Sequence, residues 1–327
     1  MALGLLGALA TVPYVALRPG PTFDTLGVVA GKTVVDIRGT QTYPTTGQLN
    51  MTTVSVVDNV TLYGALTLWI SARSALVPRD EIFPPALSDE QVEKQSQELF
   101  RDSETNAKTA ALRYLGYPTE VVAGQVAADG AASGTLVVGD RLLAVDGREV
   151  RTAQQVVDVL ADSRPGQLVR VRFQRGDAPP QDTAISLGAG VRSDRGYLGV
   201  GVADSPNVNF GIAISLTDVG GPSAGLMFAL AIVDKLTPGP LTGGTFVAGT
   251  GEITTDGQVG PVGGVPLKMI RAREAGASVF LVPGGNCAEA ISRVPDGLRL
   301  VRVGTLAEAV QALDAARAGQ QPPGCAS

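Results

Sequence analysis

Ser223 and Lys268 are the two residues of this sequence whose types and positions best suit a nucleophile and its base. Ser223 stands in the turn "GGPSAG" (220–225), where the apolar stretch 224–233 begins. Most serines that open a helix are simple N-caps, but the exposed N–H groups there also favour the developing negative charge of an oxyanion. The chain contains no histidine, so a Ser-His-Asp arrangement is excluded and a serine nucleophile needs another base.

Lys268 is the lysine best placed to act as that base. The segment "VPLKMIRAREAG" (265–276) predicts a helix with Pro266 in its first turn and Gly276 at its end. Lys268 lies near the start of this helix and shares a face with Ala272. Burial among small apolar neighbours and the positive end of the helix dipole both lower the pKa of an amine, and a neutral lysine can accept a proton from a serine hydroxyl.

Two further elements must position this pair. The uniformly apolar run 224–233 predicts a buried helix that begins at or just after the serine, and the turn before it supplies an active-site loop of Gly220, Gly221, Pro222 and Ala224. The stretch "FVAGTGEITTDGQVGPVGGV" (246–265) predicts a strand and a hairpin that turns at Asp256-Gly257. Three residues of this stretch either support the site or serve only the hairpin: Thr250, Glu252 and Thr254.

The N-terminal part of the chain predicts different elements. The first 17 residues carry no charge, which favours an incomplete signal anchor over 1–18; the alternative is a buried N-terminal strand or helix. Ser88 and Gly116 are start and stop signals for a helix. From these patterns we expect strands in 32–58, an amphipathic helix in 61–77 and one long helix in 88–117.

Composition excludes several classes of function. The formal net charge is −5 and no basic run occurs, so nothing favours nucleic-acid binding. Without histidine and with two cysteines, no zinc site is expected, and no Gly-x-x-x-x-Gly-Lys-Ser/Thr loop is present for ATP. We therefore expect no metal and no cofactor. Cys287 and Cys325 either form a disulfide or remain two free thiols.

Residues 116–188 resemble a PDZ domain. The carriers of this resemblance are "GTLVVGDRLLAVDGREV" (134–150) and the helical pattern "TAQQVVDVL" (152–160) after it. The resemblance implies that an extended peptide segment binds as an added strand, and the alternative is a small β domain that serves only as a spacer. It also suggests that a peptide carboxylate is held by the backbone of Tyr114, Leu115, Gly116 and Tyr117.

A second resemblance covers the region of the serine and the lysine. The segments "GGPSAG", "GTGEITTDGQVGPVGGV" (249–265) and "LKMIRAREAGASVFLVP" (267–283) are similar, in order and spacing, to the proteolytic domain of the Lon protease family. The resemblance implies peptide-bond hydrolysis by a Ser-Lys dyad, which falls on Ser223 and Lys268. One position departs from the family pattern, because Gly220 stands where an acidic residue is usual.

Together the patterns predict an α+β, multi-domain chain, and the two resemblances imply that it acts as an ATP-independent serine endopeptidase on extracytoplasmic proteins. Its expected partners are protein substrates, peptide segments bound by the PDZ domain, the cell membrane through a single-pass anchor, and further copies of itself. The alternative function is a non-catalytic, membrane-tethered PDZ adaptor. The expected regions are an anchor over 1–18, a mixed α/β region over 19–115, a PDZ domain over 116–188, a Lon-like domain over 189–316 and a flexible tail over 317–327.

Overall fold

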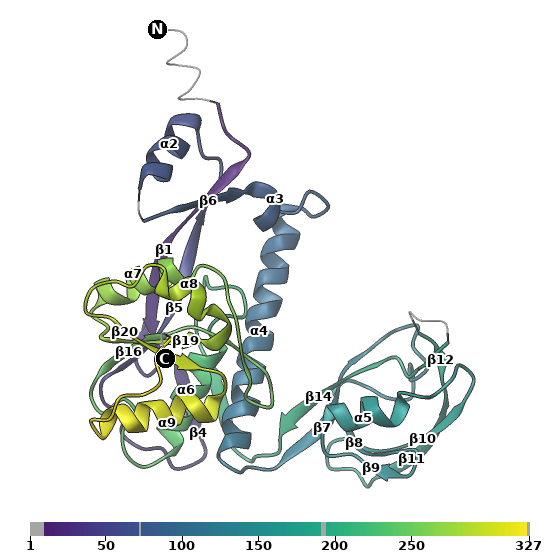
Figure 1. Ribbon diagram of the computed structural model, residues 1–327. Helices are drawn as coiled ribbons and strands as arrows, with labels where there is room; N and C mark the ends of the chain where they lie inside the picture. Colours follow the sequence, from purple (N-terminus) through teal and green to yellow (C-terminus); the bar gives the residue numbers. More distant parts are fainter. Residues whose placement is uncertain (1–9, 72, 191–193, 326–327) are drawn as a thin grey trace. The chain divides into compact units, whose positions relative to one another are not determined.

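The chain folds into two compact units (Figure 1). The computed structural model describes residues 10–71, 73–190 and 194–325. The first unit combines the chain up to Leu115 with the chain from Asn209 onward, and the second unit is Gly116–Val208. The sequence analysis treated 19–115 and 189–316 as separate regions, whereas here they share one hydrophobic core, with the second unit inserted between them in the chain.

A mixed sheet forms the centre of the first unit. Its strand order is β20-β19-β16-β5-β1-β6, in which β20, β19, β16 and β5 are parallel and the last two pairings are antiparallel. In this order the strands are Arg299–Val303, Val279–Pro283, Phe246–Gly249, Gln48–Val57, Tyr14–Asp24 and Ala75–Pro78.

Helices cover both faces of this sheet. On one face α4, α6 and α9 pack against alternate residues of the strands, and on the other face α7 and α8 do so. The alternation is clear in β19, where Leu281 contacts the first group of helices and Phe280 the second. The helices are α4 Asp89–Tyr114, α6 Gly225–Leu236, α7 Val265–Ala275, α8 Cys287–Ile291 and α9 Leu306–Arg317.

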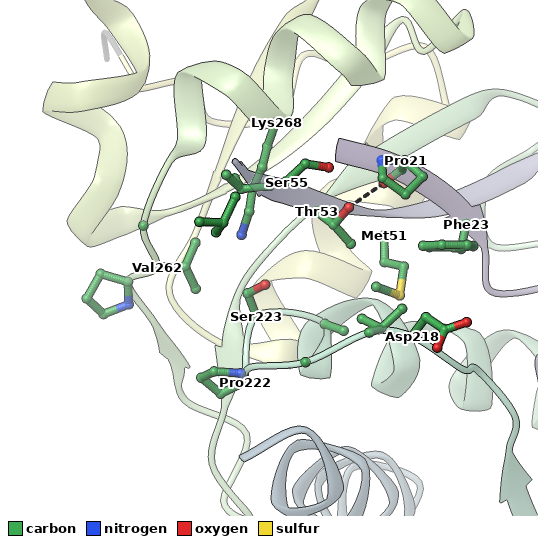
Figure 2. A pocket seen from close by; sticks show the side chains of 17 residues that line it. Pro21, Phe23, Met51, Thr53, Ser55, Asp218, Pro222, Ser223, Val262 and Lys268 are labelled. Atoms are coloured by element: carbon green, nitrogen blue, oxygen red, sulfur yellow. Dashed lines mark hydrogen bonds between the residues drawn. The ribbon is translucent and has the colours of Figure 1, made fainter. Parts of the chain in front are cut away.

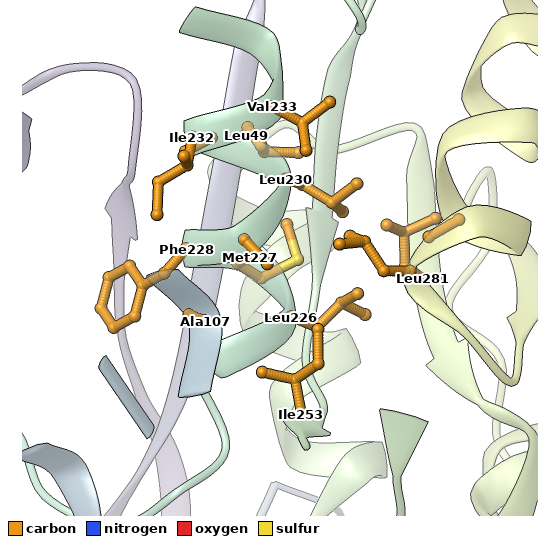
Figure 3. Packing of buried hydrophobic residues seen from close by; sticks show 14 of the residues in the cluster. Leu49, Ala107, Leu226, Met227, Phe228, Leu230, Ile232, Val233, Ile253 and Leu281 are labelled. Carbon is orange, nitrogen blue, oxygen red and sulfur yellow. The ribbon is translucent and has the colours of Figure 1, made fainter. Parts of the chain in front are cut away.

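Helix α6 is buried on all sides, as the sequence predicts. All of its residues from Gly225 to Asp234 are buried, and the ring of Phe228 meets Phe100 of α4 edge-on with 5.8 Å between centroids. Figure 3 shows its large apolar side chains packed among those of neighbouring elements. Each such fully buried side chain contributes about 1.5–3 kcal/mol to folding, so this helix is a rigid support for the turn that precedes it.

The predicted helix boundaries hold well for α4 and α7. Ser88 caps α4 through a capping box with Gln91, and Gly116 follows the helix with a φ of +81°. The prediction for 61–77 is wrong in its second half. Helix α2 ends at Ile70, and residues 75–78 form β6 because they pair with β1, a long-range contact that outweighs local periodicity.

Only the second half of the predicted anchor over 1–18 belongs to the described residues. Residues 1–9 lie outside the described residues, whereas residues 14–18 begin strand β1 and pair with β5 and β6. For this part of the segment the structure has a strand, which was the alternative to an anchor. Within 10–71, 73–190 and 194–325, no helix is both long and apolar enough to cross a membrane.

The remaining elements of the first unit are short. Strand β4 pairs with β15, β17 pairs with β18, and β2 pairs with β3. The pairing of β17 and β18 confirms the predicted hairpin, in which Gly257 has a φ of +86°. These elements are β2 Val28–Val29, β3 Lys32–Thr33, β4 Val35–Arg38, α2 Leu62–Ile70, α3 Arg79–Ile82, β15 Gly211–Ile214, β17 Glu252–Ile253, β18 Val259–Gly260 and the 3-10 helix η1 Gly284–Asn286.

A disulfide ties down the C-terminal segment that the sequence predicts to be flexible. Cys325 is bonded to Cys287 at the start of α8, and both pack against the apolar cluster around α7. The backbone N–H of Arg302 also donates to the carbonyl of Pro323, over 2.9 Å. The segment up to residue 325 is therefore part of the folded unit, and of the two alternatives for the cysteines the structure has the disulfide.

The second unit is an antiparallel sheet with one helix. Its strand order is β11-β10-β8-β7-β14, with β9 paired to β8 and a separate pair formed by β12 and β13. Its core includes Leu142, Val171 and Val156 of α5. The elements are β7 Thr119–Val126, β8 Arg141–Val145, β9 Arg148–Glu149, α5 Ala153–Leu160, β10 Leu168–Gln174, β11 Gln181–Ser186, β12 Gly188–Ala189, β13 Gly196–Tyr197 and β14 Val200–Pro206.

Strand β14 differs from the sequence-based expectation. Residues 192–206 read as a linker and the first strand of the domain that follows, but Val200–Pro206 completes the sheet of the second unit by pairing with β7. The register runs from Val200 opposite Val126 to Pro206 opposite Thr119. An inserted unit returns its chain close to the point of entry, and antiparallel pairing of the entering and leaving strands achieves this.

Candidate active site

Ser223 and Lys268 line one pocket of the first unit, with a volume of about 650 Å³ (Figure 2). Three parts of the chain form its walls: the paired strands β1 and β5, the loop 218–224 before α6, and the turn 261–263 before α7. Figure 2 shows the Lys268 amine directed toward the side of the pocket that holds Ser223. The two residues that the sequence singles out are thus brought to one cavity.

Ser223 does not act as a helix cap. The N-cap position of α6 belongs to Ala224, without a side-chain capping bond, so Ser223 stands one residue earlier. Its carbonyl accepts hydrogen bonds from Gly251 N at 2.9 Å and Thr250 Oγ1 at 3.1 Å. The backbone of Ser223 is therefore held by the segment after β16, and its hydroxyl is left to the pocket.

Lys268 is a buried amine. Its side chain projects from the first turn of α7, the residue is 3% exposed, and Nζ donates to Thr250 Oγ1 over 2.9 Å. Burial lowers the pKa of this amine from the ordinary 10.5 to about 8, and the negative charge of Glu289 opposes the shift only in part. At pH 7 about a tenth of Lys268 is then neutral, and this fraction rises with pH; the neutral amine is the form that a general base requires.

Thr250 links the two residues. Its fully buried hydroxyl accepts a hydrogen bond from Lys268 and donates one to the carbonyl of Ser223. The hydroxyl therefore acts both as acceptor and as donor. Of the three supporting candidates, Thr250 therefore contacts the pair directly. Thr254 instead bonds within the hairpin, to Asp256 and to Gln258 N. Glu252 is an exposed residue of β17.

Helix α4 braces the loop before α6. Gly221 N donates to the carbonyl of Ser96 over 2.9 Å, and Ser103 Oγ donates to the carbonyl of Pro222 over 2.9 Å. Gly220, which stands where the Lon resemblance leads one to expect an acidic residue, packs against Ser96, and a Cβ there would require the Ser96 hydroxyl to rotate away. The sequence analysis missed this contact, although two serines seven residues apart lie on one face of a helix.

We expect Ser103→Ala to lower kcat for a peptide substrate by roughly 3- to 10-fold. The substitution removes a hydrogen bond worth about 1 kcal/mol that holds the loop, and leaves the Pro222 carbonyl without this donor. The measurement is steady-state cleavage corrected for the folded fraction. Thr105→Ala is the matched control, because its hydroxyl bonds only within α4, to the carbonyl of Arg101, and does not reach the loop. Equal kcat values for Ser103→Ala and wild type would contradict a positioning role for Ser103.

The second unit offers a strand edge beside a helix. β14 is the last strand of its sheet, and Ala153 N at the start of α5 donates to the Asp204 carboxylate of β14 over 2.6 Å. An edge strand next to a helix is the geometry in which a peptide can add as a further strand. The sequence analysis did not identify β14 as part of this unit and so did not identify this edge.

Residues 114–117, predicted to hold a peptide carboxylate, lie at the end of α4 and the entry to the second unit. Tyr114 is the last residue of α4 and Leu115 N donates to the carbonyl of Ala111, so these backbone groups belong to a helix end. Gly116 and Tyr117 begin the second unit. A similar run, Tyr197-Leu198-Gly199, directly precedes β14, and Gly199 has a φ of +78°. The repetition of Tyr-Leu-Gly in the sequence was the signal that could have identified the second copy.

Comparisons with known proteins match both units. Residues 210–314 match the family described as the Lon protease (S16) C-terminal proteolytic domain, and residues 119–175 match the PDZ domain family. A Lon protease of Clostridioides difficile is 40% identical over 79 residues, which are 24% of this chain and 10% of that protein. A Lon protease of Chloroflexus aggregans is 32% identical over 147 residues, 44% of this chain and 17% of that protein.

Among solved structures, the PDZ domain of an SdrC-like protein from Listeria monocytogenes aligns with 23% identity and a TM-score of 0.24. The alignment covers 25% of this chain and 86% of that domain. The chain spans only 10% and 17% of the two Lon proteases, so the similarity concerns domains rather than whole proteins. This chain therefore carries a PDZ domain and, after it in sequence, a Lon-type proteolytic domain.

Proposed function

We propose that the protein is a serine endopeptidase that works without ATP through a Ser223–Lys268 dyad. Neutral Lys268 takes the hydroxyl proton while Ser223 Oγ attacks the scissile carbonyl carbon. The tetrahedral oxyanion is held by the backbone N–H groups of Ser223 and Ala224, because Pro222 has none and that of Gly221 is bonded to the Ser96 carbonyl. As the C–N bond breaks, Lys268 returns the proton to the leaving amine, and water then hydrolyses the acyl-enzyme with Lys268 as base again.

The buried amine of Lys268 is the observation that carries this proposal. A lysine that is 3% exposed and whose pKa is lowered to about 8 is costly for folding, because the charged form loses its hydration. A group of this kind in a pocket with a serine is typical of a catalytic site. A docking domain without catalysis has no use for such a residue, which counts against the adaptor alternative.

We further propose that the substrates are extracytoplasmic proteins and that the second unit binds their extended segments at the edge of β14. The disulfide between Cys287 and Cys325 supports this location, because disulfides persist in oxidising compartments. The sequence contains no phosphate-binding loop for ATP, so we propose no ATP-driven unfolding of the substrates by this chain. Substrates would have to be already extended or be presented by the PDZ domain.

The test is incubation of the purified full chain with a permanently unfolded protein, with and without ATP. We expect fragments of equal amount in both reactions, detected by mass spectrometry, and phosphonylation of the enzyme at Ser223 by a serine-reactive phosphonate. Strict dependence of cleavage on ATP would contradict the proposal. So would the absence of both fragments and phosphonylation from a correctly folded sample.

A further inference from the structure

Strand β5 extends beyond its parallel neighbour β16. The pairing of the two strands ends where Met51 lies opposite Gly249, although β5 continues to Val57. On its other side β5 stays paired with β1 as far as Val57. Among the residues that the structure describes, no strand pairs with β5 on the β16 side beyond Met51. The last part of β5 is therefore a free sheet edge.

The backbone hydrogen bonds at the start of β5 show which residues point toward this edge. Gln48 N donates to the carbonyl of Thr245, just before β16, over 3.2 Å. The carbonyl of the next residue, Leu49, accepts instead from Thr25 N, just after β1, over 3.0 Å. Successive residues of a strand direct their N–H and C=O groups to opposite sides. The even-numbered residues of β5 therefore point toward the side of β16.

Val54 and Val56 are the residues that present free backbone groups there. Thr52, the preceding residue on this side, still contacts β16, because its hydroxyl donates to the carbonyl of Gly249 over 3.0 Å. In β1, Pro19 lies opposite Val54, and a proline without an N–H fits a position where Val54 bonds to nothing in β1. Both valines line the pocket that holds Ser223.

This pocket occupies the place where a longer β16 would lie. Thr250, the residue after β16, is the one that bonds to both Ser223 and Lys268. Figure 2 shows Thr53 and Ser55 of β5 on one side of the cavity and Ser223 on the other, with the Lys268 amine directed between them. A strand added to β5 at the usual spacing of about 4.8 Å would therefore pass between this edge and the serine.

The other two walls of the pocket have backbone groups that are already engaged. The N–H and C=O groups of Val262 both bond to the side-chain amide of Asn286, each over 2.8 Å. In the loop before α6, Gly221 N is bonded to the carbonyl of Ser96 and Pro222 has no N–H. Strand β5 is therefore the wall that offers donors and acceptors at a regular spacing.

We infer that the substrate chain binds as an added strand on the free edge of β5, paired with Val54 and Val56, so that its scissile bond meets Ser223. This inference rests on the proposed peptidase function and adds how the substrate is held. Main-chain pairing accepts extended segments of varied sequence, because all residues except proline carry the same N–H and C=O groups. It selects against proline and against folded segments at the positions that pair.

A scan of backbone N-methylation along a short fluorogenic peptide tests the inference without changing the protein. Each amide except the scissile one is methylated in turn, and kcat/KM is measured with the full chain. We expect losses of about tenfold or more at every second position near the scissile bond, and small changes at the positions between them. This alternation appears whichever way the peptide runs. Equal effects at neighbouring positions, or no effect at any position, would overturn the inference.

Val56→Pro removes one donor from the edge. Its N–H points away from β1, so the pairing of β1 and β5 keeps its hydrogen bonds and the fold should hold. We expect kcat/KM for the unmethylated peptide to fall about tenfold. Val56→Thr is the matched control, because threonine keeps the N–H and a similar shape, and it should cleave as wild type does. Equal kcat/KM for the proline and threonine variants would contradict pairing at Val56.

Labelling by a small phosphonate without peptide groups separates this inference from the proposed function. Such a probe needs Ser223 and Lys268 but no strand pairing, so Val56→Pro should react at the wild-type rate. If wild type neither cleaves the unmethylated peptide nor reacts with the probe, the proposed function itself fails. If wild type does both and the N-methyl scan shows no alternation, only the binding of substrate to β5 is excluded.

Discussion

Ser223→Ala is expected to lose peptide-bond cleavage by about 10⁴-fold or more in kcat, because no acyl-enzyme can form without the hydroxyl. The residual rate measures what the oxyanion site and substrate binding contribute alone. The measurement is cleavage of a fluorogenic peptide at saturating concentration, together with loss of phosphonate labelling. Both readouts should fall together if Ser223 is the nucleophile.

Folding should survive this substitution. The carbonyl of Ser223 keeps its hydrogen bonds from Gly251 N and Thr250, and the hydroxyl does not cap α6. Thermal unfolding of the variant should therefore match that of wild type. Ser292→Ala is the matched control, since this exposed serine lies in the same unit outside the pocket and should keep full activity. Activity of Ser223→Ala within tenfold of wild type would exclude the dyad.

Lys268→Met is expected to abolish cleavage to a similar extent while making the protein more stable. Methionine has a similar length and fills the buried space without the cost of a desolvated amine. We expect a gain of about 2 kcal/mol in the free energy of unfolding at pH 7, after allowing for the lost bond to Thr250. Chemical denaturation measures this gain, and peptide cleavage measures the loss of activity.

The sign of the stability change depends on pH in a defined way. Below pH 8 both the folded and the unfolded chain hold the proton of Lys268, so the full cost of burial is present. Between about pH 8 and the ordinary value of 10.5 the unfolded chain binds the proton and the folded chain does not, so wild type gains stability as pH rises. Lys268→Met lacks this gain, and the stability difference between the two proteins should shrink over this range.

The activity of wild type should rise with pH for the same reason. Only neutral Lys268 can accept the proton, so kcat/KM should increase about tenfold per pH unit below its pKa and level off above about 8. Lys235→Met is the matched control: burial also lowers the pKa of Lys235, but its amine donates to the carbonyl of Val35 outside the pocket. That variant should keep both activity and the pH profile. A pH-independent rate in wild type would contradict Lys268 as base.

Much of the local structure around the candidate site could be predicted from the sequence. The uniform apolarity of α6, the proline and glycine that bound α7, and the Asp256-Gly257 turn are signals contained within a few consecutive residues. Such signals act through backbone propensity and side-chain periodicity. For that reason the expected elements and the structure agree at these positions.

The PDZ region was predicted less completely, because one of its strands depends on a distant partner. Strand β14, Val200–Pro206, lies far along the chain from β7, which ends at Val126. No tight turn joins the two strands, so nothing local in the sequence indicates that they pair. The same holds for residues 75–78, which continue a helical pattern but pair with β1. Local periodicity reports which face of an element is apolar, and it does not report which element covers that face.

The sequence by itself determined which reactive groups this protein has: no histidine, a serine in a glycine-rich turn, and a lysine at the start of a helix. Only the tertiary structure decided that both side chains share one pocket, that Thr250 joins them, and that α4 braces their loop. The physical reason is distance along the chain. Ser103 and Pro222 are 119 residues apart, and only the packing of the whole unit brings such partners together.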